Sequence, residues 1–223
     1  MALQELSHAV EDYAKAIYSL QHRCGGEPVS TNDLAERLEV TPASASSMIK
    51  KLAELGLVAH VPYKGVQLTP DGERLALEVL RHHRLLERYL ADELGVPWDR
   101  VHEEAEALEH VISEDLEERI ADKLGNPTHD PHGDPIPDAR LRIDEEDTRS
   151  LADLRPGDRG RFVRVSDSDP AMLRYLSERG VAIGDELEVL ERQPFGGPLT
   201  VRFGDAEHVL GGGLAAAMRV ELD

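Results

Sequence analysis

The stretch between residues 29 and 69 constrains the fold of this chain more than any other. Two short helical patterns are separated by a tight turn, and two β-type runs follow them over residues 57–69. The first pattern predicts a helix over 31–38. The second predicts a helix over 42–55, because Pro42 suits the first position of a helix. Helix, turn, helix and β-hairpin in this order indicate a winged helix-turn-helix domain.

The surface of the second helix suits contact with DNA, because small residues (alanine and serine) fill its first turns and two lysines follow. Small side chains let a helix enter the major groove, hydroxyl groups can bond bases or phosphates, and methyl groups can touch thymine. Between residues 40 and 70, three lysines stand against one glutamate, a local net charge of +2. The turn, the proline and the hairpin together disfavour the alternative, a helical bundle with a solvated serine-rich helix. We expect DNA contacts from Thr31, Ala43, Ser44, Ser46, Ser47, Lys50, Lys51 and Lys64.

The chain as a whole is acidic. Its 44 acidic and 25 basic residues give a formal net charge of −19 over 223 residues. Such a charge disfavours binding of nucleic acid by the average surface, so DNA contact must depend on a local one. It also fits a protein whose carboxylates gather cations.

The sequence contains no signal for a membrane or for secretion. There is no apolar run near the length of a membrane span, about 18 residues, and the first residues lack a basic start followed by an apolar block. The single cysteine, Cys24, excludes an internal disulfide framework and a cysteine-rich zinc site. We therefore expect a cytoplasmic protein without a membrane partner.

A second feature, the stretch from residue 83 to residue 110, is rich in side chains that bind metals. Apolar spacing predicts helices over 70–94, 98–111 and 114–124. Residues three or four apart on a helix share a face. The first helix would present one imidazole with one carboxylate and the second would present two of each, which suits a divalent metal. These ligands are His83 and Glu87, then His102, Glu106, Glu109 and His110.

Two classes of enzyme use histidine and glutamate on helices, and the spacing here disfavours both. A zincin needs His-Glu-x-x-His, but Glu106 stands where the second histidine after His102 would be. A di-iron centre needs Glu-x-x-His on two helices, but Leu80 and Ala107 stand where those glutamates would be. We expect no enzyme and no small-molecule substrate. A protein-binding module remains an alternative, and it would act without metal or DNA.

Two further segments carry possible ligands. Residues 3–22 predict a helix with Asp12 beside its apolar stripe. Residues 125–147 are rich in proline, glycine and acids and predict a linker. Its His129, Asp130 and His132 could be additional ligands.

The last third of the chain changes character. Short β-type runs are separated by turn signals and interrupted by one helix over 169–179, which predicts a small SH3-like barrel. The helices before it are apolar enough for a dimer interface as well as a core. The fold class is therefore mainly α with β. We expect a winged helix-turn-helix DNA-binding domain (1–70), a helical metal-binding and dimerisation domain with its linker (71–147) and an SH3-like β-barrel domain (148–223).

Taken in order, these parts resemble the diphtheria toxin repressor family of metal-dependent transcriptional repressors. The stretches HRLLERYL, VHEEAEALEHVISE and HGDPIP match the family in order and spacing, and the resemblance covers essentially the whole chain. It implies a homodimer that binds double-stranded, palindromic operator DNA near metal-uptake genes when metal is bound.

The resemblance implies two metal ions per subunit. The primary site would use Asp12, Glu106, Glu109 and His110. The iron-sensing branch of the family has methionine and cysteine at the positions of Asp12 and Glu106, so the pair found here is typical of the manganese-sensing branch. Carboxylates are hard ligands that suit Mn(II), but Fe(II) accepts oxygen and nitrogen ligands too and is the alternative.

The ancillary site implied by the resemblance would use His83, Glu87 and His102, completed by Asp169 from the C-terminal domain. Met172 departs from the glutamine of the family, and a thioether is a poor ligand for Mn(II).

Two further positions bear on the number and place of the ions. Some manganese-sensing streptococcal members take ligands from a Cys-Pro-His stretch, which Asp130-Pro131-His132 matches here. Lys15 stands where short manganese regulators have a glutamate that builds a paired-metal site. This difference favours two separated sites.

Overall fold

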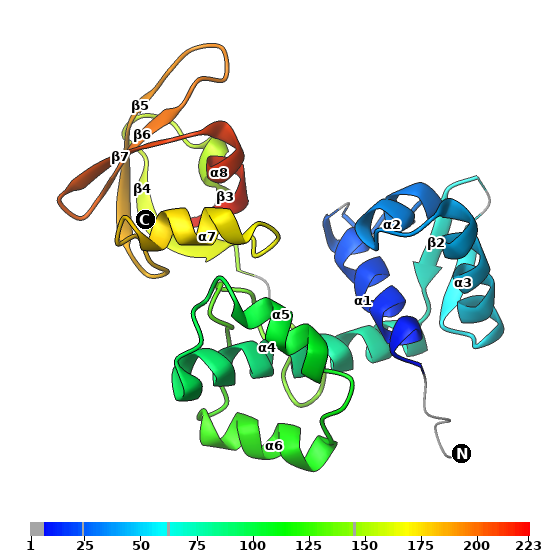
Figure 1. Ribbon diagram of the computed structural model, residues 1–223. Helices are drawn as coiled ribbons and strands as arrows, with labels where there is room; N and C mark the ends of the chain where they lie inside the picture. Colours follow the sequence, from blue (N-terminus) through cyan, green and yellow to red (C-terminus); the bar gives the residue numbers. More distant parts are fainter. Residues whose placement is uncertain (1–6, 24, 62, 145) are drawn as a thin grey trace. The chain divides into compact units, whose positions relative to one another are not determined.

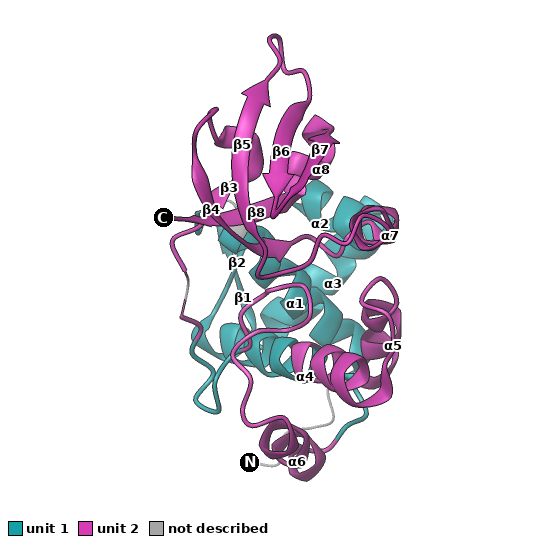
Figure 2. Ribbon diagram, turned by 90° about the vertical axis from the view of Figure 1, so that its left-hand side faces the viewer, with its two compact units in different colours: residues 1–83, 109–112, 137–142 teal, residues 84–108, 113–136, 143–223 magenta. Residues whose placement is uncertain are grey.

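A computed structural model of the chain describes residues 7–23, 25–61, 63–144 and 146–223. It divides into two compact units (Figure 2). In the part of the chain that it describes, no helix is long and apolar enough to cross a membrane. Unit 1 comprises Met1–His83, Glu109–Ile112 and Pro137–Arg142, and unit 2 comprises Arg84–Leu108, Ser113–Ile136 and Ile143–Asp223.

Unit 1 opens with helix α1, His8–Arg23, which packs Ile17 and other apolar residues into a core (Figure 1). The sequence predicts this helix from residue 3. Residues 3–6 lie outside the described part, and Ser7 is not helical. The carbonyl of Ser7 accepts hydrogen bonds from the amides of Val10 and Glu11, so the helix begins at His8.

The helix-turn-helix follows as predicted, with α2 at Thr31–Arg37 and α3 at Pro42–Glu54. Each helix is capped by the hydroxyl before it, since the side chains of Ser30 and Thr41 accept hydrogen bonds from the amides of Asp33 and Ser44. Pro42 occupies the first turn of α3, where a missing amide costs nothing. The two helices pack through buried Leu34, Ala35, Ala45, Ile49 and Leu52.

Strands β1, Val58–Val61, and β2, Gly65–Leu68, form the antiparallel wing. Val29 adds a bridge to Val66 of β2. This bridge requires glycine at 65, because a Cβ there would lie 1.9 Å from the Val29 carbonyl oxygen and φ is +124°.

Helix α4, Pro70–Leu94, begins in unit 1 and ends in unit 2. In the rest of the helical region, α5 covers Val101–Leu108 and α6 covers Glu114–Lys123. The helix predicted over 98–111 is therefore wrong at both ends. At its C-terminal end the chain must leave the helix early, because Ser113 adopts extended backbone (ψ 155°) to cap α6.

Within residues 146–223 the chain forms a six-stranded antiparallel sheet in the order β3-β8-β4-β5-β6-β7. The helix predicted over 169–179 is present as the shorter α7, and the helical α8 was not predicted. The strands are β3 (Arg149–Ser150), β4 (Arg159–Val165), β5 (Glu186–Arg192), β6 (Leu199–Phe203), β7 (Ala206–Leu210) and β8 (Met218–Leu222), and the helical segments are η1 (Leu151–Asp153), α7 (Pro170–Ser177) and α8 (Gly212–Ala217).

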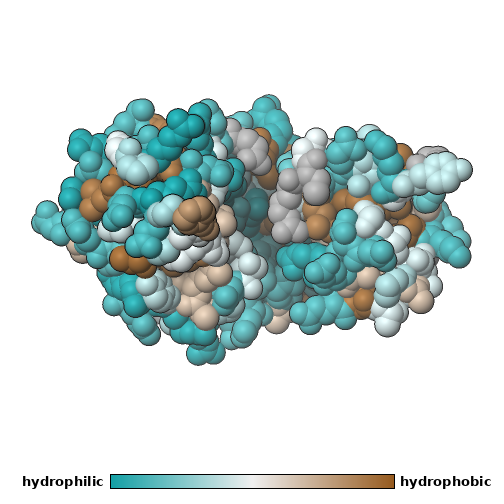
Figure 3. Space-filling view, turned by 90° about the horizontal axis from the view of Figure 1, so that it is seen from above, coloured by the Kyte–Doolittle hydropathy of each residue, from teal (hydrophilic) through white to brown (hydrophobic). Residues whose placement is uncertain are grey.

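This sheet packs a buried core that includes Phe162, Val201 and, from α7, Leu176. The linker lies directly against it, since the amide of Val165 in β4 donates to the carbonyl of His132 at 2.9 Å. The sheet thus holds the linker histidine in a defined place. Hydrophilic side chains cover much of the face drawn in Figure 3, in keeping with the net charge of −19.

Candidate metal centres and nucleic-acid interface

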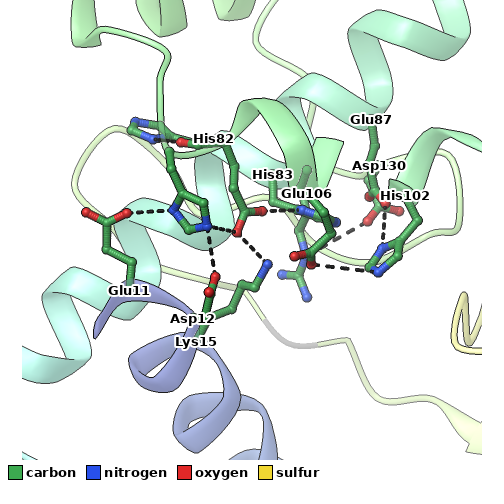
Figure 4. A network of polar contacts seen from close by, with 12 residues as sticks. Glu11, Asp12, Lys15, His82, His83, Glu87, His102, Glu106 and Asp130 are labelled. Carbon is green, nitrogen blue, oxygen red and sulfur yellow. Dashed lines mark hydrogen bonds and ion pairs between the residues drawn. The ribbon is translucent and has the colours of Figure 1, made fainter. Parts of the chain in front are cut away.

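Asp12, Glu109 and His110 form a cluster in unit 1, called here the primary cluster. One potential ligand atom from each lies within 4.8 Å of the others. The Nε2 of His110 is 2.8 Å from the Oδ1 of Asp12 and 3.4 Å from the Oε1 of Glu109. Figure 4 shows Asp12 projecting from α1 into this network. The cluster offers two carboxylates and one imidazole, a donor set that fits a hard divalent cation.

Glu109 and His110 reach this cluster from a turn and not from a helix face. Helix α5 ends at Leu108, and both residues follow it. On a helix, two consecutive side chains point about 100° apart, whereas in the turn both approach Asp12. The expectation that these two residues share a helix face with Glu106 is therefore wrong, although the residues themselves lie together.

Glu11 supports His110, and the sequence analysis missed it. The Nδ1 of His110 donates to the Oε2 of Glu11 at 2.6 Å, and His8 stacks on the same ring with centroids 4.7 Å apart. A carboxylate on one ring nitrogen orients the other nitrogen toward a metal. The available signal was an acidic residue directly beside a predicted ligand.

Glu109 is buried and ionised. Its side chain is 0% exposed; Oε1 accepts from the Nζ of Lys15 at 2.6 Å, and Oε2 pairs with the Nδ1 of His83. Burial raises the pKa of this carboxyl, but the contacts with His83 and Lys15 outweigh burial and hold the pKa below its usual value. His83, which the resemblance assigns to the ancillary site, thus contacts a member of the primary cluster.

Glu87, His102 and Asp167 lie together in unit 2. The Nδ1 of His102 is 2.9 Å from the Oδ2 of Asp167 and 3.3 Å from the Oε1 of Glu87. The hydrogen bond to Asp167, followed by that to Glu87, raises the pKa of His102 to about 10. Glu106 is on α5 in the same unit, with Oε1 3.7 Å from the Nε2 of His102.

The linker adds Asp130 and His132 to Glu87, again with ligand atoms within 4.8 Å of one another. His132 is fully buried, and its Nε2 donates to the carbonyl of Trp98 at 2.7 Å. Its Nδ1 has no hydrogen-bond partner among the described residues and lies 3.8 Å from the Oε2 of Glu87. A buried nitrogen left without a partner beside a carboxylate is the condition expected of a metal ligand. We call Glu87, His102, Asp130, His132 and Asp167 the ancillary cluster.

Electrostatics around the linker favour a cation. Burial lowers the pKa of His132, but Glu87, Asp130 and the carbonyl of Trp98 together outweigh burial and raise that pKa to about 9. Burial, Asp134 and Glu87 raise the pKa of Asp130 well above its usual value. Bound protons therefore neutralise part of the negative charge here, and a metal ion could replace them.

Contrary to the expectation from the resemblance, Asp169 belongs to none of the groups of potential ligand atoms that lie within 4.8 Å of one another among the described residues. Its Oδ1 accepts the amide of Ala171 at 2.9 Å and caps α7, and Pro170 follows it in the first turn. Asp167, two residues earlier, reaches His102 instead. The reason is local, because a short polar residue directly before a helix is recruited by the unpaired amides of its first turn.

The predicted DNA-binding residues of α3 lie on one exposed side of the helix, and Ala45, Ile49 and Leu52 lie on its buried side. Thr31 is half-buried at the start of α2. Lys64 is exposed in the wing and pairs with Glu27 at 3.3 Å. The exposed residues of α3 are Ala43, Ser44, Ser46, Ser47, Lys50 and Lys51.

A winged helix in a chain with clustered oxygen and nitrogen ligands defines a class, the metal-responsive DNA-binding proteins. Residues 5–66 match the iron dependent repressor N-terminal DNA binding domain, 69–138 the iron dependent repressor metal binding and dimerisation domain, and 149–222 the FeoA domain. The chain is 33% identical to the diphtheria toxin repressor of Corynebacterium efficiens, over 98% of this chain and 97% of that protein. The chain therefore belongs to the diphtheria toxin repressor family of metal-dependent transcriptional repressors.

Other relatives differ in the metal they are named for. The iron-dependent repressor IdeR of Mycobacterium tuberculosis is 34% identical, over 98% of this chain and 99% of that protein. A solved manganese-dependent transcriptional repressor, in complex with manganese, is 44% identical with a TM-score of 0.88, covering 96% of this chain and 100% of that one. The manganese regulator SloR is 33% identical with a TM-score of 0.78, covering 96% and 98%.

These findings confirm the predicted fold class, which combines helical DNA-binding and dimerisation domains with a C-terminal FeoA domain. They also confirm a DNA-binding, metal-binding regulator of transcription. The matched domains indicate DNA and a second copy of the chain as partners.

Proposed function

We propose that this protein represses manganese-uptake genes by binding Mn(II) and then operator DNA in the cytoplasm. The observation that carries the proposal is the primary cluster, in which Asp12, Glu109 and His110 offer only oxygen and nitrogen. Such ligands suit Mn(II). The 44% identity to a manganese-dependent repressor supports the same choice. Fe(II) is the second candidate, because it accepts the same ligands and IdeR is 34% identical.

Two ions per subunit are proposed. The primary ion would be held by Asp12, Glu109 and His110 with Glu106 as a further ligand. The ancillary ion would be held by the ancillary cluster, with Asp167 taking the role first expected of Asp169, and His83 remains a proposed ligand one turn before Glu87 on α4. The unpartnered Nδ1 of buried His132 supports the ancillary site.

A bound divalent cation supplies positive charge to carboxylates that otherwise repel one another. Asp12 belongs to α1, and α1 shares a hydrophobic core with α2 and α3. Holding Asp12 close to Glu109 and His110 therefore restrains the helix-turn-helix through this packing. For this to regulate DNA binding, the restrained arrangement must be the one that binds DNA. In a homodimer, two α3 helices would then fit the two half-sites of a palindrome.

The test is operator binding by gel shift with and without Mn(II) or Fe(II), the latter under anaerobic conditions. Glu106→Ala and His110→Ala should each abolish the dependence of DNA binding on metal. Glu104→Ala is the matched control, because Glu104 is an exposed acid on α5, the helix that carries Glu106. Unchanged metal dependence in both site variants would refute the proposal.

A further inference from the structure

Lys15 occupies an unusual place for a lysine. Its Nζ lies 2.6 Å from the Oε1 of Glu109, and its side chain is only 14% exposed. Lys15 is three residues after Asp12 on α1, so both side chains share one face of the helix. Figure 4 shows them projecting together from α1. A fixed positive charge thus touches an oxygen of the primary cluster.

The same oxygen faces the rest of the cluster. The Oε1 of Glu109 is 3.4 Å from the Nε2 of His110, which itself is 2.8 Å from Asp12. Any cation that used Asp12, Glu109 and His110 together would have to approach this region. A cation there would lie beside the ammonium group of Lys15 unless that side chain moved away from Glu109.

We propose that Lys15 is a tethered cation that competes with the metal at the primary cluster and thereby raises the metal concentration at which this cluster fills. The proposal rests on the primary cluster being a metal site, as argued above. It adds a residue that tunes the response without ligating the metal.

The physical reason is the burial of Glu109. A carboxylate with 0% exposed side chain needs compensating positive charge. In the absence of metal, His83 supplies it at Oε2 and Lys15 supplies it at Oε1, the oxygen that faces His110, so Lys15 helps to stabilise the metal-free protein. A divalent ion beside the ammonium is repelled at short range, so metal binding requires Lys15 to withdraw or the repulsion to be tolerated. Both lower the affinity.

Lysine suits this role better than arginine would. Its ammonium is a single point charge on a flexible chain, and it can leave a carboxylate without any backbone change. The same charge disfavours a second divalent ion directly beside the first, so the cluster is expected to hold one ion.

The test is Mn(II) binding to the full chain, followed by the electron paramagnetic resonance of free Mn(II). All proteins carry His102→Ala, which removes a proposed ancillary ligand so that the primary cluster is read alone. Lys15→Gln keeps a hydrogen-bond donor and removes the charge, and it should bind Mn(II) about tenfold more tightly or better. Lys15→Met gives a second uncharged variant. Lys15→Arg keeps the charge and should bind Mn(II) no more tightly than the parent.

Thermal unfolding supplies an independent readout. Lys15→Gln should melt at a lower temperature than the parent without metal, and saturating Mn(II) should narrow or reverse that difference. Lys123→Met is the matched control, because it removes an exposed lysine that forms an ion pair with Glu93. It should change neither the Mn(II) affinity nor the melting temperature.

Two results would overturn the inference. One is unchanged or weaker Mn(II) affinity in both uncharged variants, and the other is an equal loss of melting temperature with and without Mn(II). If His110→Ala binds Mn(II) as the parent does, the primary site itself fails, and the Lys15 inference fails with it. A site that needs His110 but is insensitive to Lys15 refutes the inference alone.

Discussion

The Nδ1 of His110 donates to the Oε2 of Glu11 across 2.6 Å, so that the Nε2 of the same ring faces Asp12 at 2.8 Å. One carboxylate of α1 thereby orients the imidazole, and the next residue in the chain supplies a proposed ligand beside it. The two neighbours in sequence have different roles.

Replacing Glu11 should weaken metal binding without removing a ligand. Glu11→Ala leaves His110 free to rotate and to change tautomer, and loss of such a partner typically costs 10- to 100-fold in metal affinity, a range we expect here to order of magnitude. Calorimetric titration with Mn(II) measures the change. Glu11→Gln retains a hydrogen-bond acceptor and should lose less. Equal affinities of Glu11→Ala and the parent would show that Glu11 does not position the ring.

The two acids before α7 should have separate effects. Asp167→Asn should lower the affinity of the ancillary cluster for its ion, because Asp167 contacts His102 at 2.9 Å. The same variant should leave α7 intact. Asp169→Asn should preserve much of the cap, whereas Asp169→Ala should reduce the free energy of unfolding by about 1 kcal/mol without changing the number of ions bound. Metal counting and urea unfolding on the same samples test both. Loss of an ion in Asp169→Ala and not in Asp167→Asn would restore Asp169 as the ligand.

Gly133 should be required for the linker to lie on β4. Its φ is +85°, and a Cβ there would lie 1.9 Å from the carbonyl oxygen of Val163. Gly125 is the matched control, with φ +74° and no atom within 4 Å of such a Cβ. Both alanine variants bear the same backbone strain, so Gly133→Ala should lose at least about 1 kcal/mol more of unfolding free energy than Gly125→Ala. Gly133→Ala should also lower the affinity of the ancillary cluster for its ion, because the proposed ligand His132 is the preceding residue. Equal losses in urea unfolding would contradict the clash.

The stability of the metal-free protein should fall as pH rises above neutrality. Asp167 and then Glu87 raise the pKa of His102 from 6.5 to about 10. A raised pKa means that the folded state binds more protons, so this stabilisation is complete below pH 6.5 and is lost as pH rises through about 10. Unfolding in urea from pH 6 to pH 10 with chelator present measures the slope. His102→Gln should flatten it, and an unchanged slope in that variant would exclude His102 as its source.

Proton release should accompany metal binding for the same reason. His102 carries a proton in the metal-free protein at neutral pH and must lose it to become a ligand. Titrations with Mn(II) in buffers of different ionisation enthalpy should therefore give different apparent enthalpies. His102→Gln should reduce that dependence on buffer.

Much of this protein is determined by sequence over short distances. The caps at Ser30 and Thr41 and the proline in the first turn of α3 each act within a few residues, so the helix-turn-helix can be predicted from the sequence alone. In α4 and the linker, the residue types and their spacing in the sequence are enough to identify possible metal ligands.

Tertiary structure decided the contacts between distant residues. Glu11 meets His110 across 99 positions, and Lys15 meets Glu109 across 94. No local pattern specifies such pairs, because they depend on the path of the chain after α5 and on how α1 packs. The same holds for Asp167, which reaches His102 from a position 65 residues later in the chain, whereas Asp169 caps α7. The sequence determines which side chains can bind a metal, but the packing of the fold determines which of these side chains lie together.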